Sequence, residues 1–197
     1  MFEAEELVNL IKELRGNKQG GEQKRILIAL DGRCAAGKTT LAAYLSSAVD
    51  GTVFHMDDYF LRPFQRTRER LDTPGGNVDY ERFREEILQP LASGAGEISY
   101  RPYNCQKQEL EEAVMTQVRP VVIVEGSYSC HPELWDFYDL HVFVDIDSRE
   151  QMKRILHRDG EAKSEQFRDK WIPLEEQYFK ECHILEKCDI YMTTAGG

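Results

Sequence analysis

A glycine-rich segment in the first quarter of the chain has the spacing of a phosphate-binding loop. The residues Gly32-Arg-Cys-Ala-Ala-Gly37-Lys38-Thr39 fit the pattern G-x-x-x-x-G-K-[ST]. Glycines permit a tight turn that points successive backbone N–H groups at phosphate oxygens, and a helix that follows adds its positive end. Lys38 is expected to reach the β- and γ-phosphates, and Thr39 to place its hydroxyl on Mg²⁺. The predicted site for Mg·ATP therefore comprises Gly32, Arg33, Cys34, Ala35, Ala36, Gly37, Lys38, Thr39 and Thr40.

Carboxylates follow two aliphatic runs of the sequence. Glu125 ends the run Val121–Val124, and Asp57 and Asp58 come directly after the run Thr52–His55. If these runs are parallel strands, their carboxyl ends open toward the phosphate loop. Glu125 is then placed to hold Mg²⁺, and one of the two aspartates to accept a proton from an attacking hydroxyl. The alternatives are an ordinary acid at a strand end and a capped helix with an acidic first turn.

A cluster of basic residues stands out in this acidic chain. Arg154 and Arg158 are four positions apart in a helical pattern, so they share a face, and Arg149 and Arg168 lie nearby. We interpret residues of about 149–170 as a basic lid that closes over the transferring phosphoryl group. The alternative is a solvated, charged helix.

The elements that must position these residues alternate between short aliphatic runs and helical patterns. Strands are predicted at Ile26–Leu30, Thr52–His55, Val121–Val124, His141–Val144 and Ile190–Met192, and helices at 3–15, Thr39–Ser47, Tyr80–Leu91, Arg149–His157 and Pro173–Leu185, with a polar turn at Gly16–Gly21. This alternation indicates an α/β P-loop NTPase fold in three layers, α/β/α, around a mostly five-stranded parallel sheet. Residues of about 97–119 are less regular and are interpreted as an inserted arm. Residues 1–197 are expected to form a single domain.

Composition excludes several classes of protein. The 197 residues are 41% hydrophobic and 30% charged, which is typical of a globular chain. The formal charge of −10 argues against a general nucleic-acid binder, and five cysteines without a C-x-x-C pair argue against a zinc site. No apolar run is long enough to span a membrane, and the N-terminus lacks the basic region of a signal peptide. We therefore expect a cytoplasmic protein.

Together these segments resemble the uridine kinase family of P-loop kinases, which is itself similar to phosphoribulokinase and bacterial pantothenate kinase. The resemblance covers about Arg25 to Asp159. Met56-Asp57-Asp58-Tyr59-Phe60 is similar to the family segment whose first acid is the general base, which implies Asp57. Val124-Glu125-Gly126 matches the family's Glu-Gly, and the arginines resemble its lid.

Two further segments of the family bear on the acceptor. Gly76-Asn-Val-Asp79-Tyr resembles the segment whose aspartate binds ribose hydroxyls, and Tyr100-Arg-Pro-Tyr103-Asn-Cys resembles the arm whose tyrosine lines the nucleoside pocket. Asn104 replaces the usual aspartate of that arm, and Gln106-Lys-Gln108 replaces the Thr-His that helps to read the pyrimidine. The resemblance thus implies retained catalytic residues and an altered base-reading part.

The resemblance implies transfer of the γ-phosphoryl group of ATP to a nucleoside hydroxyl, with uridine or cytidine 5′-OH expected first. The catalytic residues implied are Asp57, Lys38, Arg154 and Arg158, the substrate contacts Asp57, Tyr59, Asp79 and Tyr103, and the Mg²⁺ ligands Thr39 and Glu125. Alternative acceptors are ribosylnicotinamide, pantothenate, a sugar or a sugar phosphate. A nucleotide-binding regulatory module without turnover is the alternative from another class. Family analogy also suggests a homo-oligomer, and the segment Lys170–Phe179 is given only a packing role.

Overall fold

A parallel sheet forms the centre of the molecule. The computed structural model describes residues 3–17 and 25–193. Its main sheet contains β1 (Ile26–Gly32), β2 (Gly51–His55), β7 (Val121–Glu125), β8 (Leu140–Asp145) and β9 (Ile190–Thr193). The strands lie in the order β2-β7-β1-β8-β9, and every pairing is parallel. All five strands predicted from the aliphatic runs are therefore confirmed, each extended by one or two residues.

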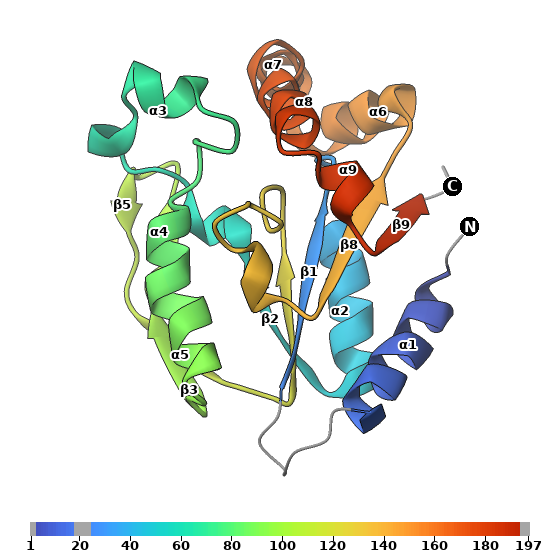
Figure 1. The fold of residues 1–197 in the computed structure, drawn as a ribbon. Helices are drawn as coiled ribbons and strands as arrows, with labels where there is room; N and C mark the ends of the chain where they lie inside the picture. The colour runs from blue at the N-terminus through green and yellow to red at the C-terminus, as the bar shows by residue number, and fades with distance from the viewer. Residues whose placement is uncertain (1–2, 18–24, 194–197) are drawn as a thin grey trace.

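Helices cover both faces of this sheet (Figure 1). On one face α1 (Ala4–Asn17) and α2 (Lys38–Val49) pack against Ile26, Ile28 and Leu30 of β1. On the other face the helix of residues 80–92 and α8 (Ile172–Glu181) enclose Leu27 and Ala29. The alternation along β1 follows from the period-two geometry of a strand, because both of its faces are buried. The predicted three-layer α/β/α fold is confirmed. The turn predicted at Gly16–Gly21 lies largely outside the described residues.

Two helices of the structure continue through a proline, one at Pro90 and one at Pro173. Residues 80–92 run as α4 (Tyr80–Phe83), a π-helical turn (Arg84–Leu88) and α5 (Gln89–Ala92), with Pro90 inside. Residues 161–181 run in the same way as α7 (Glu161–Gln166), a π-helical turn (Phe167–Trp171) and α8, with Pro173 inside. Each π turn ends two residues before its proline and shifts the backbone hydrogen bonds to a spacing of five residues, as in Ile172 N–H to Phe167 O. The missing N–H of the proline is therefore accommodated.

The prediction that Pro173 opens a helix ending at Leu185 is wrong at both ends. The helical backbone already begins at Glu161, so residue 170, where the expected lid ends, is not a boundary. The helix ends at Glu181 because His183 has a φ of 55°, and α9 (Ile184–Lys187) begins beyond it. Gly160, with a φ of 81°, separates α7 from α6 (Ser148–Asp159).

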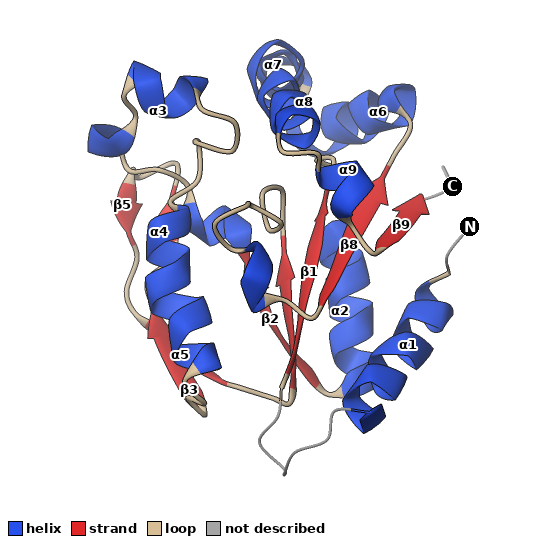
Figure 2. Cartoon of the chain, in the orientation of Figure 1, coloured by secondary structure: helices blue, strands red, loops and turns tan. Residues whose placement is uncertain are grey.

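The irregular segment after α5 folds into two antiparallel pairs. β3 (Glu97–Tyr100) pairs with β6 (Val114–Gln117), and β4 (Tyr103–Asn104) pairs with β5 (Glu109–Leu110) within it. Figure 2 shows this arm beside the helix of residues 80–92, on the side of the molecule that also carries α3 (Arg68–Asp72). The sequence pattern did not predict α3.

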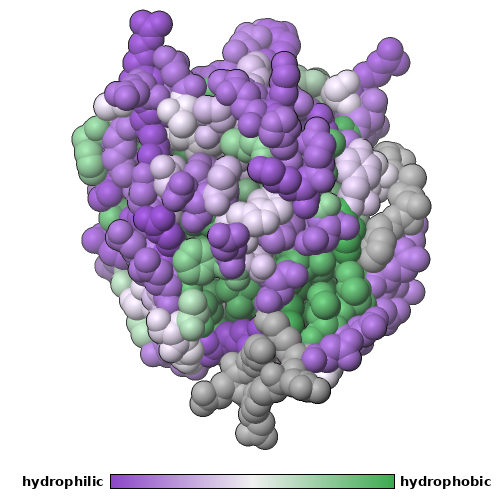
Figure 3. All heavy atoms as spheres, in the orientation of Figure 1, coloured by the Kyte–Doolittle hydropathy of each residue, from purple (hydrophilic) through white to green (hydrophobic). Residues whose placement is uncertain are grey.

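The register of the sheet decides where the candidate chemistry lies. Glu125, the last residue of β7, is level with Leu30 of β1 and with His55 of β2. The loops that leave these three strands therefore meet at one edge of the sheet, below α3 and α6 to α8 in Figure 1. In Figure 3 the upper rim of the visible face is mostly hydrophilic. No helix in the described part of the chain has the length and apolar character needed to cross a membrane.

Candidate active site

The phosphate loop joins β1 to α2 and is bent by residues with positive φ. Gly32, Ala35 and Gly37 have φ values of 132°, 60° and 90°. A Cβ atom at Gly32 would lie 2.0 Å from the carbonyl oxygen of Val144 on the adjacent strand, so only glycine lets β1 stay beside β8 here. Since α2 begins at Lys38, its free N–H groups face the concave side of the loop. The segment thus has the backbone shape that the sequence predicts for a phosphate site.

Side chains from distant elements hold the outside of this loop. Gln151 of α6 donates from Nε2 to Cys34 O at 3.1 Å, and Arg154 donates from Nη1 to Ala35 O at 3.3 Å. The Arg33 side chain turns away from the loop and forms ion pairs with Asp145 and Glu176. Of the residues predicted to bind ATP, Cys34, Ala35, Gly37, Lys38, Thr39 and Thr40 line the cavity described below, whereas Gly32, Arg33 and Ala36 do not.

Lys38 is buried, with 7% of its surface exposed, and its ammonium group is folded back over the loop. Nζ donates to Gly32 O at 2.7 Å, to Arg33 O at 2.8 Å and to Ser127 Oγ at 3.4 Å. These bonds fix a positive charge at the centre of the loop. A phosphate entering the loop would meet that charge together with the N–H groups of α2.

Thr39 and Glu125 lie close enough to bind one cation. Thr39 Oγ1 donates to Glu125 Oε1 at 3.2 Å, and Glu125 is only 5% exposed. His55 Nδ1 lies 2.5 Å from the same Oε1 atom, and this hydrogen bond raises the pKa of the imidazole. A hydroxyl and a carboxylate are the hard oxygen donors that Mg²⁺ prefers, so the donor set fits that ion. His55, which the sequence did not single out, orients the carboxylate.

Asp57 follows β2 on a 3-10 turn (Met56–Tyr59) and faces the same cavity. Its carboxylate is accessible from the cavity, but protein atoms surround it on the other sides, and this burial raises its pKa while Lys38 opposes the shift. A raised pKa makes a carboxylate a better proton acceptor. Gly126 leaves room for this turn, because a Cβ there would lie 2.8 Å from Met56 Cβ.

The two predicted lid arginines both line the cavity. Arg154 donates from Nε to Glu150 Oε1 at 3.1 Å in addition to its bond to the phosphate loop. Arg158 pairs with Asp159 at 2.7 Å, and 55% of its side chain is exposed. Arg154 is therefore held against the loop, whereas Arg158 stands at the solvent side of α6.

One cavity of about 860 Å³ lies between the loop, the arm, α3 and the helix of residues 161–181, and it is lined by Lys38, Thr39, Asp57, Glu125, Arg154 and Arg158. Besides the groups above, its lining has an apolar and aromatic part and a polar part. The further lining residues are Phe60, Leu61, Arg66, Leu71, Asn77, Cys105, Gly126, Ser127, Tyr128, Lys163, Gln166, Phe167, Trp171 and Glu175. A cavity of this size accommodates a nucleotide together with a second small molecule.

Residues 27–169 match the phosphoribulokinase / uridine kinase family. The chain belongs to this family. Uridine-cytidine kinase C of Dictyostelium discoideum is 22% identical over 162 residues, which cover 80% of this chain and 35% of that protein. Uridine kinase of Halobacterium salinarum is 28% identical over 141 residues, which cover 67% of this chain and 61% of that protein. The match thus spans less than two thirds of the length of either relative.

A solved structure described as a fructose transport system kinase from Silicibacter sp. TM1040 has the same fold. It superposes with a TM-score of 0.70 at 18% identity and covers 94% of this chain and 98% of its own. This likeness agrees with the P-loop fold of the family and says nothing about the acceptor.

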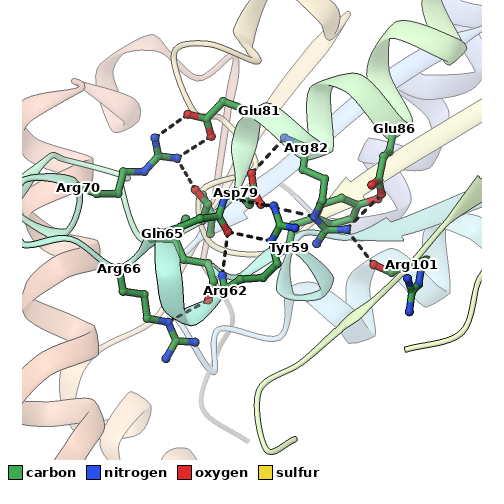
Figure 4. A network of polar contacts seen from close by, with 12 residues as sticks. Tyr59, Arg62, Gln65, Arg66, Arg70, Asp79, Glu81, Arg82, Glu86 and Arg101 are labelled. Atoms are coloured by element: carbon green, nitrogen blue, oxygen red, sulfur yellow. Dashed lines mark hydrogen bonds and ion pairs between the residues drawn. The ribbon is translucent and has the colours of Figure 1, made fainter. Parts of the chain in front are cut away.

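Of the substrate contacts expected from the family resemblance, Asp57 lines the cavity, whereas Tyr59, Asp79 and Tyr103 do not. Asp79 is 2% exposed and caps α4, where Oδ1 accepts from Arg82 N–H at 3.2 Å and Oδ2 accepts from Gln65 Nε2 at 2.8 Å (Figure 4). Tyr59 is fully buried and donates to Glu86 Oε2 at 3.2 Å. Their contacts with an acceptor stay predictions, since both side chains serve here to fix the loop between β2 and α4.

Tyr103 of the arm reaches the cavity only through a partner. It is 4% exposed, and its hydroxyl accepts from Arg66 Nη2 at 3.2 Å. Arg66 lines the cavity and also donates from Nε to Leu61 O at 2.9 Å. Tyr103 therefore fixes the direction of a guanidinium group that lines the cavity.

The lining side chains that sequence reasoning missed include Arg66, Ser127, Phe167 and Glu175. Ser127 stands two positions after the predicted Glu125, so its closeness to the loop was available from the sequence. Arg66 and Phe167 lie in segments without a strand to anchor them, and Glu175 lies in a helix that pattern alone assigns to packing. Their positions depend on tertiary contacts.

Proposed function

We propose that this chain is a P-loop kinase that transfers the γ-phosphoryl group of Mg·ATP to a hydroxyl group of a small molecule. The observation that carries the proposal is the meeting of Lys38, Thr39, Asp57 and Glu125 at one cavity. They come from three separate segments of the chain and supply a cation, a metal-binding pair and a proton acceptor. Membership of the phosphoribulokinase / uridine kinase family supports the same chemistry.

Each group has a distinct task in this reaction. Thr39 Oγ1 and Glu125 Oε1, which are 3.2 Å apart, would hold Mg²⁺. The ion, when bound, draws negative charge from the phosphate oxygens. Asp57 orients the acceptor hydroxyl and takes its proton. Lys38, Arg154 and Arg158 offset the charge on the transferring phosphoryl group.

The first candidate acceptor is the 5′-OH of uridine or cytidine. The two relatives named above are a uridine-cytidine kinase and a uridine kinase. The aromatic side chains of Phe60, Phe167 and Trp171 line the cavity and favour a flat ring. Gln106-Lys-Gln108 stands where the family has the pair that reads the pyrimidine. The backbone N–H groups of Gln106 and Lys107 donate to Asn104 Oδ1, both at 2.9 Å, so this segment forms a turn of the arm.

A second candidate is an acceptor that carries a phosphate or carboxylate. Arg66 favours it, since its guanidinium faces the cavity and its two hydrogen bonds go to uncharged oxygens of Leu61 and Tyr103. Among the described residues no carboxylate forms an ion pair with Arg66. A phosphate or carboxylate group of the acceptor would accept hydrogen bonds from the Arg66 guanidinium and pair with its charge.

A panel of acceptors tests both candidates. ADP release with Mg·ATP is measured for nucleosides, ribosylnicotinamide, pantothenate, sugars and sugar phosphates. Turnover with uridine or cytidine supports the first candidate, and turnover restricted to anionic acceptors supports the second. Binding of Mg·ATP without turnover on any acceptor would contradict the kinase proposal and favour a regulatory module.

The variant Arg66→Gln separates the two candidates further. For an anionic acceptor it should raise KM about 10- to 100-fold, because a charged hydrogen bond is lost, while KM for ATP stays unchanged. For a nucleoside the change should remain below about threefold. Arg68→Gln is the matched control, since the Arg68 side chain is 95% exposed in the same segment. An equal effect of both variants would exclude a specific role for Arg66.

A further inference from the structure

The helix α8 presents polar side chains to the phosphate loop from the far side of the cavity. Glu175 and Tyr178 are three positions apart and share a face. Tyr178 donates from its hydroxyl to Asp31 Oδ2 at 2.8 Å, and Glu175 accepts from the N–H of Cys34 at 3.0 Å. Asp31 is the residue before Gly32, so the two contacts hold the loop at its first turn. This segment has no task in the reaction proposed above.

Glu175 is a buried carboxylate with both oxygens in use. It is 5% exposed, and burial raises its pKa while the charge of Lys38 opposes the shift. Oε2 accepts from Cys34 N–H, and Oε1 accepts from the Ser127 hydroxyl at 2.7 Å. A buried carboxylate is costly unless its environment compensates it, so a position with two well-formed hydrogen bonds indicates a specific task.

The carboxylate connects to Lys38 through Ser127. A hydroxyl carries one proton, and the Ser127 proton is directed to Glu175 in the shorter of its two donor contacts. The oxygen of Ser127 is then free to accept from Lys38 Nζ, 3.4 Å away. Glu175, Ser127 and Lys38 form a hydrogen-bonded chain from α8 to the centre of the phosphate loop.

We propose that Glu175 is a positioning residue for nucleotide binding, which rests on the proposed use of the loop for Mg·ATP. Its carboxylate accepts the Cys34 N–H and so holds the backbone of the loop, and through Ser127 it fixes the direction of the Lys38 ammonium before the nucleotide arrives. Preorganised donors bind phosphate more tightly because less ordering is left to the binding step.

A carboxylate this near to the loop could instead compete with phosphate as a second anion. The contacts of Lys38 argue against that role. Its three N–H groups go to Gly32 O, Arg33 O and Ser127 Oγ, so none is directed at the carboxylate as it would be at a bound phosphate. Glu175 therefore holds the loop backbone and Ser127 and takes no N–H group of Lys38 directly.

Glu175 also ties the opposite wall of the cavity to the loop. The helix of residues 161–181 is continuous, and its earlier turns carry Gln166, Phe167 and Trp171 into the cavity lining. An anchor at Glu175 sets how far these side chains stand from the phosphates. Loss of the anchor should therefore weaken nucleotide binding and shift this wall of the cavity.

The test measures binding of Mg·ATP to the full chain by calorimetry, without an acceptor. Glu175→Ala should raise Kd about 10- to 100-fold, the loss expected for hydrogen bonds to a charged group. Glu175→Gln should stay within about fivefold of the wild type, because its amide oxygen can still accept from Cys34 N–H. Glu181→Ala is the matched control, because Glu181 is an exposed glutamate of the same helix that accepts from Gln177 Nε2 at 3.1 Å.

A second measurement does not need the nucleotide. Hydrogen exchange of the Cys34 amide, followed by NMR in the nucleotide-free protein, should become at least tenfold faster in Glu175→Ala and stay unchanged in Glu181→Ala. Unaltered exchange, or Kd values at or below that of the wild type in both Glu175 variants, would overturn the proposal. A wild-type chain that does not bind Mg·ATP would contradict the proposed function instead, and the exchange result would still decide whether Glu175 holds the loop.

Discussion

His131 should make the free energy of unfolding fall at acidic pH, because the fold buries its neutral side chain. The side chain is 6% exposed and stacks on Tyr80 with ring centroids 4.0 Å apart. Nδ1 accepts from the Glu133 N–H at 3.2 Å, which requires the neutral ring with its proton on Nε2. Burial, assisted by the charge of Arg70, lowers the pKa of His131 to about 4 from an ordinary value of 6.5. Protonation would therefore charge a buried ring and remove a hydrogen-bond acceptor.

Protonation of His131 destabilises the folded chain, because the pKa of His131 is lower in the folded state than in the unfolded state. Between pH 6.5 and pH 4 the unfolded chain binds a proton at His131 and the folded chain does not. The free energy of unfolding therefore falls as the pH drops through this window. Full protonation would cost about 3 kcal/mol, and the loss between pH 8 and pH 5 should be about 2 kcal/mol.

Urea unfolding of the wild type and of His131→Phe at pH 8 and at pH 5 measures this difference. The phenyl ring keeps the stacking and does not titrate, while every other group titrates in both proteins and cancels. The wild type should lose about 2 kcal/mol more than the variant between the two pH values. Equal losses would refute the assignment of a buried neutral imidazole, whatever the absolute stability of the variant at pH 8.

Two further predictions concern the phosphate loop and the proton acceptor. Asp57→Asn should lower kcat by about 10²- to 10⁴-fold and leave Kd for Mg·ATP within about threefold, because the amide keeps the shape of the site but takes up no proton; a wild-type kcat would exclude Asp57 as the base. Gly32→Ala should destabilise the chain by more than about 2 kcal/mol in urea unfolding and abolish nucleotide binding, since its Cβ would lie 2.0 Å from Val144 O. Gly16→Ala is the control, with no atom within 4 Å of the added Cβ, and equal stability of the two variants would contradict the steric argument.

The sequence was sufficient to predict the strands of the main sheet, the phosphate loop, and the carboxylates at the strand ends beside that loop. Short apolar runs predicted every strand of the main sheet. The signal is continuous for β1, β7 and β8, which are buried on both faces, and weaker for the edge strands β2 and β9. The phosphate loop follows from a local motif whose geometry depends on its own glycines. Glu125 and Asp57 follow from strand ends, because the end of a strand fixes which edge of the sheet a residue occupies.

The elements that the sequence did not predict depend on contacts between distant segments or on a shift of the backbone hydrogen bonds. Pro173 favours a helix start in any local analysis, yet the π turn before it lets the helix begin at Glu161. The helix α3 has only five residues and carries no periodic pattern, so its position depends on contacts such as that of Arg70 with Glu81 at 2.6 Å. Asp79 shows the same limit at the site, since its motif predicts a substrate contact while its neighbours in the fold occupy its oxygens.

This difference explains why the reaction is easier to infer than the acceptor. The proposed ATP end of the cavity is built from one loop and two strand ends, and a local sequence motif fixes the backbone of that loop. The proposed acceptor end is built from side chains such as Phe60, Arg66, Cys105 and Trp171, which come from four segments with no fixed spacing. A substitution in any one of these segments changes the shape or charge of the acceptor end without touching Lys38, Thr39 or Glu125. Acceptor preference can therefore diverge within the family while the phosphoryl-transfer residues stay in place.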